Sequence, residues 1–225
     1  MKTIDPADSK GLAAWQSFIE KENLTEHQAQ QFKRYLELLL AWNEDINLTS
    51  IESIATVISH HFQDSLAVAQ AVSFTQEDMI CDVGSGGGFP GIPLKIKYPY
   101  LKVILIEVQH KKRIFLQTVI KELGLVDIEL NAYDWRTFLR KTSYPITYFL
   151  ARASLRPDEL IRLFSPSTAY NNATLIYWAS QSWQLAPKEE PYFIKETSYS
   201  IDSKKRRLIF FAKTHTPDNH QKFDK

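Results

Sequence analysis

The sequence is poor in several residue types and patterns, and each shortage excludes a class of protein. Its 225 residues include one cysteine, Cys81, which excludes a disulfide framework and a metal site built from several cysteines. No stretch reaches the roughly 18 to 20 uncharged apolar residues that a membrane-spanning helix needs. The opening residues carry Asp5 and Asp8 and lack an apolar run, so we expect no signal peptide. These absences predict a soluble, cytoplasmic protein with no membrane segment and no metal.

The two signs of charge are unevenly distributed along the chain. Residues 1–80 hold 5 Lys and Arg against 12 Asp and Glu, which gives −7, whereas residues 81–225 hold 22 against 14, which gives +8. This segregation suggests a polyanion that meets the second part only, but on charge alone the favoured explanation is an uneven scatter of surface charge. A hydrophobic content of 44% excludes disorder of the whole chain.

The hydrophobic pattern changes near residue 79. Before it, apolar residues with helical spacing predict helices at 12–19, 25–40 and 54–72, and Thr25 with Gln28 forms a capping-box signature. After it, short apolar runs alternate with helical patterns. We expect strands at 79–83, 103–106, 128–131, 146–151 and 174–178, helices at 91–98, 114–123 and 160–164, and a hairpin of 192–199 and 208–212 around a turn at 202–204.

This alternation predicts an α/β fold with a doubly wound, Rossmann-like sheet. The sheet is expected to be mostly parallel, with an antiparallel edge strand near the C-terminus. We divide the chain into an N-terminal helical extension (1–75), a ligand-binding domain (76–213) and a polar tail (214–225).

The most informative segment is a glycine-rich loop after the first predicted strand. Such crowding of glycine predicts a tight strand-to-helix turn that brings a ligand against bare backbone. A triphosphate-binding loop is disfavoured because no lysine follows until Lys95. The spacing of 86, 88 and 91 formally matches a nicotinamide-dinucleotide fingerprint, whereas that of 84, 86 and 88 suits S-adenosylmethionine. The loop holds five of the seven glycines: Gly84, Gly86, Gly87, Gly88 and Gly91.

Two carboxylates follow the next strands. Glu107 ends the second strand, 23 residues after Gly84, where a carboxylate can accept hydrogen bonds from both ribose hydroxyls. Asp134 follows the third strand, from which it can either meet an adenine amine or cap a helix.

Three segments together resemble the RsmG (glucose-inhibited division protein B) family of small-subunit ribosomal RNA guanine-N7 methyltransferases. They are Trp42–Ser50, His61–Ser65 and Asp82–Leu94, and the resemblance extends from about residue 24 to 213. It implies a class I methyltransferase fold with an N-terminal helical extension, S-adenosylmethionine as cofactor, and ribosomal RNA or the assembled small subunit as partner.

The resemblance also assigns site residues. Gly84 and Phe89 match cofactor-loop contacts, with Gly86 and Gly88 shaping the same loop, and Tyr133 with Asp134 matches the adenine-side pair. Arg152 matches an arginine close to cofactor and substrate. The chain departs from the family where His60 replaces a usual arginine, where 177–181 lacks a usual Lys-Gly pair, and where Glu107 replaces an aspartate.

The chemistry implied by the resemblance is direct in-line methyl transfer to N7 of a guanine in 16S-type ribosomal RNA. N7 of neutral guanine has a lone pair and no proton, so alignment and electrostatics suffice. The chain also lacks an Asn/Asp-Pro-Pro-Tyr/Phe motif for methylating exocyclic amines. Cys81 lies inside a strand and is expected to be core rather than a nucleophile. We therefore give Arg152 a positioning and electrostatic role.

Other readings stay open at this point. The alternatives are an NAD-dependent oxidoreductase, a non-catalytic RNA- or ribosome-binding module, and a methyltransferase for a protein or small molecule. Trp135 and Trp178 can stack a base but are more commonly core, and Asn43, Asn47 and His61 have both site and structural interpretations. We expect a monomer. Basic residues that can track phosphates are Lys111–Arg113, Arg136, Arg140, Lys141, Arg156 and Lys204–Arg207.

Overall fold

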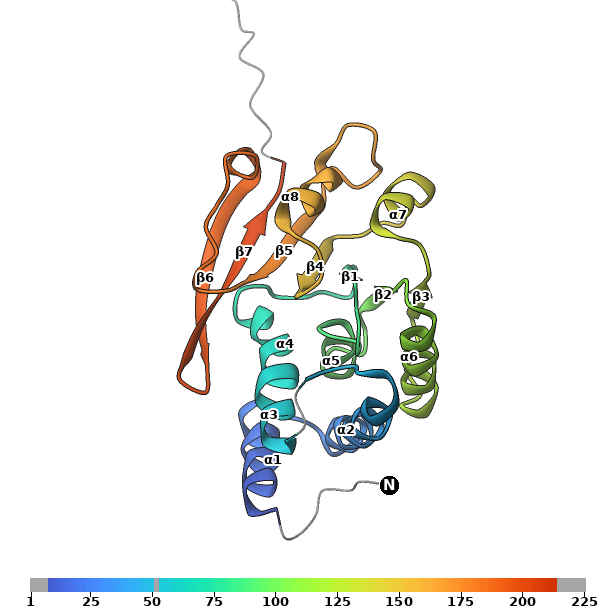
Figure 1. Cartoon of the computed structure of the whole chain (residues 1–225), viewed down its shortest axis with the longest axis vertical. Coiled ribbons are helices and arrows are strands. Elements are labelled where there is room, and N and C mark those ends of the chain that lie inside the picture. Colours follow the sequence, from blue (N-terminus) through green and yellow to red (C-terminus); the bar gives the residue numbers. More distant parts are fainter. Residues whose placement is uncertain (1–7, 51–52, 214–225) are drawn as a thin grey trace, which may run out of the picture.

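A computed structural model describes residues 8–50 and 53–213, and the polar tail predicted at 214–225 lies outside them. The N-terminal extension is helical, as predicted, and Thr25 and Gln28 form the capping box. The predicted third helix is one continuous coil that changes from α to π, back to α and then to 3-10 geometry (Figure 1). Its parts follow two longer helices: α1 (Ser9–Lys21), α2 (Glu26–Ile46), α3 (Ile54–Val57), η1 (Ile58–Gln63), α4 (Asp64–Leu66) and η2 (Ala67–Gln70).

A seven-stranded sheet forms the centre of the molecule, in the order β3-β2-β1-β4-β5-β7-β6. The first five strands are parallel, and β7 pairs antiparallel with both β5 and β6. The structure therefore confirms the predicted doubly wound sheet, with β7 as the antiparallel strand and β6 outside it. The strands are β1 (Met79–Val83), β2 (Lys102–Ile106), β3 (Ile128–Asn131), β4 (Tyr148–Arg152), β5 (Thr174–Ala179), β6 (Phe193–Ile201) and β7 (Lys204–Phe211).

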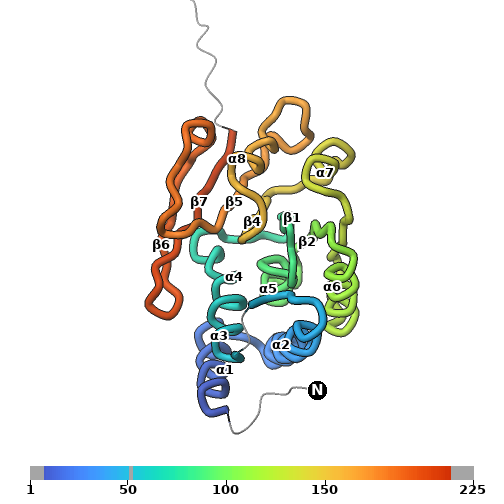
Figure 2. The backbone as a smooth tube through the Cα atoms, viewed as in Figure 1, coloured from blue at the N-terminus to red at the C-terminus, as the bar shows by residue number. Residues whose placement is uncertain are grey.

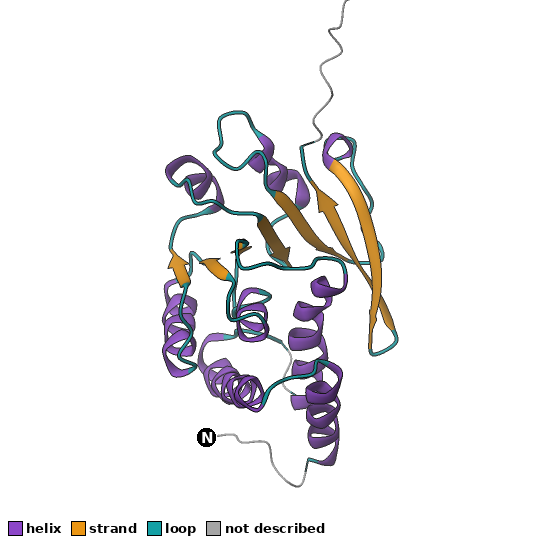
Figure 3. Ribbon diagram, turned by 180° about the vertical axis from the view of Figure 1, so that it is seen from behind, coloured by secondary structure: helices purple, strands orange, loops and turns teal. Residues whose placement is uncertain are grey.

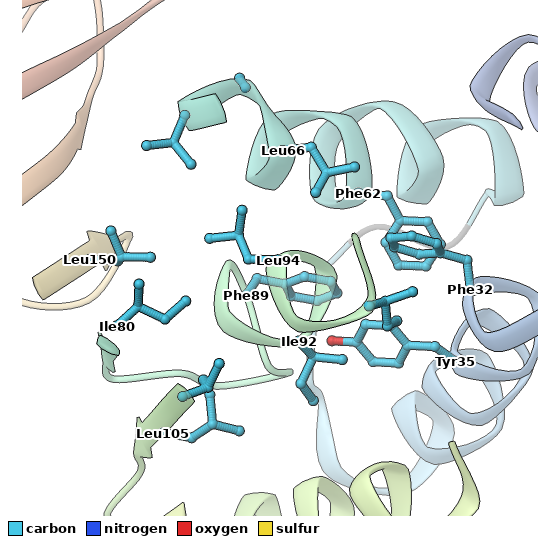
Figure 4. Packing of buried hydrophobic residues seen from close by; sticks show 14 of the residues in the cluster. Phe32, Tyr35, Phe62, Leu66, Ile80, Phe89, Ile92, Leu94, Leu105 and Leu150 are labelled. Atoms are coloured by element: carbon cyan, nitrogen blue, oxygen red, sulfur yellow. The ribbon is translucent and has the colours of Figure 1, made fainter. Parts of the chain in front are cut away.

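Helices cover both faces of the sheet (Figures 2 and 3). Side chains of a strand alternate between faces, so Ile80 joins a core shared with the extension, α5 and α6, whereas Cys81 joins a core with α7 and the segment after β4. Figure 4 shows the first core, where rings from α2 and η1 reach the glycine-rich loop. The covering elements are α5 (Gly91–Lys97), α6 (His110–Glu122), α7 (Trp135–Lys141), α8 (Pro157–Leu160), η3 (Ile161–Phe164) and η4 (Glu190–Tyr192).

Several predicted boundaries were wrong by a few residues. The strand expected at 146–151 runs from Tyr148 to Arg152, and the helix expected at 160–164 begins at Pro157. The hairpin turn is shorter than expected. Asp202 and Ser203 both have positive φ and form a two-residue turn, so Lys204 is already in β7 and pairs with Ile201. In the described part of the chain, no helix is long and apolar enough to cross a membrane.

Candidate functional site

A cleft of about 820 Å³ lies at the carboxyl ends of β1, β2 and β4. This is a volume typical of small-molecule sites, and the end of a parallel sheet is where such sites form. Six of the eight predicted cofactor-binding residues line this cleft, whereas Gly88 and Tyr133 do not; after that prediction we call it the cofactor cleft. The six are Gly84, Gly86, Phe89, Glu107, Asp134 and Arg152.

Two glycines of the loop have different surroundings although both have positive φ. A Cβ atom on Gly86 would meet only the Gly84 carbonyl oxygen, at 4.0 Å, so the backbone here is bare. A Cβ atom on Gly88 would lie 2.6 Å from Ile92 and 2.7 Å from the Tyr35 hydroxyl. Gly86 therefore leaves room for a ligand, and Gly88 allows close packing beneath the loop.

The Glu107 carboxylate ties the loop to the end of β2. It is 5% exposed, and its two oxygens accept hydrogen bonds from the backbone N–H groups of Gly86 at 2.9 Å and Gln109 at 2.8 Å. Each carboxylate oxygen has a second lone pair. The charge is thus held at the cleft wall with capacity to accept further hydrogen bonds from a ligand's hydroxyl groups.

Aromatic rings from the extension support the same loop (Figure 4). Phe89 stacks on His61 at 4.5 Å between ring centroids and on Tyr35 at 5.4 Å. The Tyr35 hydroxyl donates to the carbonyl of Gly87, and Tyr35 stacks in turn on Phe62. The conformation of the loop therefore depends on α2 and η1.

Arg152 is held by the extension rather than free in the cleft. One guanidinium nitrogen donates to the His60 carbonyl at 2.8 Å and to the Asp64 carboxylate at 2.9 Å, and the other contacts His61 Nδ1 at 3.0 Å. Its Nε is buried without a hydrogen bond, and its side chain is 13% exposed. The Arg152 guanidinium can therefore act on a ligand through its electrostatic field and through the small part of it that is exposed.

Asp64 is the centre of this cluster and was not predicted as a site residue. Its carboxylate is 1% exposed and also accepts a hydrogen bond from the Tyr199 hydroxyl at 2.7 Å, while Arg206 Nε lies 3.4 Å away. Its backbone carbonyl accepts from Trp178 Nε1 at 3.0 Å. The only sequence signal for Asp64 is its place inside His61–Ser65, one of the segments that carries the family resemblance.

His61 lines the cleft and has a partner on each ring nitrogen. Because Arg152 donates to Nδ1, Nε2 carries the proton and donates to the Thr49 hydroxyl at 2.7 Å. Burial, followed by the charge of Arg152, lowers the pKa of His61 to about 3. His61 is therefore neutral at physiological pH. Asn43 and Asn47 have the structural roles expected of them, since Asn43 accepts from the Thr49 N–H and Asn47 ends α2.

Asp134 is the N-cap of α7, one of the two roles predicted for it. Its carboxylate accepts from the Thr137 N–H at 3.0 Å and hydroxyl at 2.8 Å, and these hydrogen bonds lower its pKa. It also lines the cleft. The neighbouring Tyr133 is 41% exposed and lies outside the lining.

Buried titratable groups lie under the cleft. Burial raises the pKa of Asp82 to about 7; one of its oxygens accepts from the Gly91 N–H at 3.0 Å, and the other has no hydrogen bond.

Cys81 is fully buried in the core, as predicted. Trp135 is also core, with Nε1 bonded to the Glu159 carbonyl. Among the described residues, no group of three or more His, Cys, Asp or Glu side chains could hold a metal.

A second cleft, of about 800 Å³, adjoins the first at Arg152 and Ala153. It lies between the end of β5 and the β6–β7 hairpin. Ala153 has a φ of 53°, an uncommon left-handed conformation for a residue with a side chain. The strained residue thus lies where the two clefts meet, and we call the second one the hairpin cleft.

Comparisons with known proteins agree on one family. Residues 28–210 match the family model GidB, described as rRNA small subunit methyltransferase G. The chain is 34% identical over 211 residues to the ribosomal RNA small subunit methyltransferase G of Listeria monocytogenes, covering 88% of each, and 33% identical over 208 residues to that of a Geobacillus species, covering 88% and 87%.

Solved structures share the fold at low sequence identity. The TrmK protein of M. capricolum, solved in complex with S-adenosylhomocysteine, superposes with a TM-score of 0.51 at 16% identity over 67% of each chain. A mutant of MtNAS superposes with a TM-score of 0.56 at 12% identity over 92% of this chain and 87% of that one.

Proposed function

The chain belongs to the GidB family, rRNA small subunit methyltransferase G, and on that premise we propose that it methylates N7 of a guanine in small-subunit ribosomal RNA. It is a methyltransferase that uses S-adenosylmethionine. The observation that carries the proposal is that bare backbone at Gly86 lies beside the Glu107 carboxylate in the cofactor cleft, next to a second cleft rich in basic residues.

The residues of the cofactor cleft fit S-adenosylmethionine. We assign the amino-acid and nucleoside parts to the backbone of Gly84 and Gly86 beside Phe89, the ribose hydroxyls to Glu107, and the adenine side to Asp134. Gly88 shapes the loop from beneath, and Tyr133 is proposed to contact the adenine from the rim. When bound, S-adenosylmethionine supplies a methyl group on a positively charged sulfur.

The electrostatics of the cleft suit a reaction that needs no general base. Guanine N7 gains positive charge as it is methylated, so an uncompensated cation nearby would oppose the reaction. The buried Asp64 carboxylate at 2.9 Å offsets the charge of Arg152, and His61 is neutral. We propose that Arg152 positions the substrate edge through hydrogen bonding without adding net charge.

The partner is proposed to be the ribosomal RNA, either free or in the assembled small subunit. A ribosomal RNA substrate places the proposed activity in the cytoplasm. We also propose that the protein acts as a monomer, and that residues 1–75 form the extension and 76–213 the part that binds S-adenosylmethionine.

The test is methyl transfer from radiolabelled S-adenosylmethionine to small subunits isolated from a strain that lacks this activity. Nucleoside analysis of the digested RNA is expected to place the label in 7-methylguanosine. Label in protein alone, or in another base, would reject the proposed substrate. Binding of NADH without binding of S-adenosylmethionine would instead select an oxidoreductase. Subunits that already carry the modification are the control and are expected to accept no label.

A further inference from the structure

We propose that the hairpin cleft binds the phosphate backbone of the RNA beside the target guanosine, chiefly through Lys204, Lys205 and Arg206. The inference rests on the proposed function and deepens it, because it names the surface that recognises the substrate. It is a site for a phosphate-bearing single strand, separate from the cofactor cleft.

The position of the β6–β7 hairpin determines where this site forms. β6 and β7 continue past the other strands and descend beside α3 and α4, as both views show (Figures 1 and 3). His60 Nε2 lies 3.4 Å from Asp202 at the hairpin turn, and Tyr199 bonds to Asp64. These contacts fix the hairpin against the extension and leave the start of β7 along one wall of the cleft.

The charges of the cleft favour an anion. Four cationic side chains line it, and Asp64 is its only acid in the described part of the chain. Asp64 is already matched by Arg152 at 2.9 Å and by the Tyr199 hydroxyl. Lys204 and Lys205 are exposed, and within residues 8–50 and 53–213 neither ammonium group has an ion pair or hydrogen bond. Both are available to phosphate oxygens.

Arg206 lies between the buried cluster around Asp64 and the hairpin cleft. Its Nε is buried, lies 3.4 Å from the Asp64 carboxylate and makes no hydrogen bond, while the side chain as a whole is 32% exposed. An Arg guanidinium offers donors in a fork that matches a phosphate. Arg206 can therefore hold one phosphate from the inner side while the two lysines approach from the rim.

The remaining lining suits a nucleotide strand rather than an acidic protein. Ser180, Gln181 and Ser203 offer neutral donors and acceptors of the kind that contact phosphate and ribose oxygens, and Tyr177 offers a ring. A cleft of about 800 Å³ accommodates about one nucleotide and its flanking phosphates. Because it shares Arg152 and Ala153 with the cofactor cleft, a nucleotide held here lies next to the proposed site of methyl transfer.

The test compares K204A/K205A and K204E/K205E with K33A/K121A, a control that removes two exposed lysines from α2 and α6. The loss of two phosphate contacts is expected to reduce the slope of log association constant against log salt concentration by about 1.4 for single-stranded RNA. If variant and wild-type proteins bind equally at 1 M salt, this difference makes the variant bind RNA about 25-fold more weakly at 0.1 M salt. The measurements are the binding of protein-free small-subunit ribosomal RNA, the KM for small subunits, and the affinity for S-adenosylmethionine.

The alanine pair is expected to raise KM and the RNA dissociation constant while the S-adenosylmethionine affinity stays within twofold, and the glutamate pair is expected to raise them further. RNA binding equal to that of the control variant would overturn the proposal. So would weaker binding to assembled subunits with unchanged binding to protein-free RNA, which would assign the hairpin to a ribosomal protein. If the wild-type protein methylates no RNA, the proposed function fails, whereas the RNA-binding comparison still decides the role of the cleft.

Discussion

The substitution Gly86→Ala tests the cofactor cleft most directly because the chain offers a matched control. Gly86 has a φ of 57° and Gly124, in the turn before β3, has a φ of 61°. A Cβ atom meets nothing within 4 Å at Gly124 and only the Gly84 carbonyl, at 4.0 Å, at Gly86. Both changes carry the same left-handed strain, about 1–2 kcal/mol, so they are expected to lower the unfolding free energy equally.

The two variants differ only in what the new methyl group faces. At Gly86 it extends into the cofactor cleft, where a ligand lying against bare backbone must move away. Crowding of this kind costs about 1–3 kcal/mol, which corresponds to a roughly 5- to 160-fold weaker affinity for S-adenosylmethionine. At Gly124 the affinity is expected to stay at the wild-type value. Gly86→Val adds two further carbons and is expected to abolish binding.

Isothermal titration calorimetry with S-adenosylmethionine and S-adenosylhomocysteine measures the affinities, and urea denaturation measures the stabilities. If Gly86→Ala binds both ligands as tightly as Gly124→Ala does, the nucleoside does not lie against this glycine. A loss of affinity in both variants would point to the stability of the fold rather than to the cleft.

Three further predictions concern buried carboxyl groups. Glu107→Gln is expected to weaken S-adenosylmethionine binding by about 1–3 kcal/mol through lost charge-assisted hydrogen bonds, and an unchanged dissociation constant in calorimetry would contradict the ribose role. Asp64→Asn leaves Arg152 without its buried counter-ion and is expected to cost about 3–5 kcal/mol of unfolding free energy in urea, against less than about 1 kcal/mol for Asp158→Asn, whose side chain is partly exposed. Asp82, with a folded pKa of about 7 against 3.8 unfolded, stabilises the fold below pH 3.8 and loses this contribution as pH rises to 7. Asp82→Asn is therefore expected to remove this decrease in unfolding free energy between pH 3.8 and 7, as measured by unfolding at a series of pH values.

The features that the sequence predicts correctly are those with local signals. The alternation of short apolar runs with helical patterns predicts the parallel sheet, and Thr25 with Gln28 marks the start of α2. The glycine crowding after β1 and the acid at the end of β2 locate the two walls of the cofactor cleft. Each of these signals lies within a few residues of the feature it predicts.

The features that the sequence misses depend on contacts between distant residues. Asp64 bonds to Arg152 and Tyr199, which are 88 and 135 residues away, so no local pattern marks it as the centre of a cluster. The different roles of Gly86 and Gly88 depend on whether Tyr35 and its neighbours lie beneath the loop. The shorter hairpin turn depends on two consecutive residues with positive φ, neither of which is glycine.

The extension is therefore part of the site and not a module attached to it. Tyr35 holds the backbone of the glycine-rich loop, His61 stacks on Phe89, and Asp64 neutralises Arg152 and fixes Tyr199 of the hairpin. Tyr35 belongs to α2, whereas His61 and Asp64 reach the cofactor cleft and the hairpin cleft from one continuous coil, residues 54–70. A ligand that binds only the ordered loop must also stabilise this coil, because the two share the same packing. The boundary proposed at residue 75 is consequently a division of the sequence only, because we expect the residues on its two sides to fold and to bind ligand together.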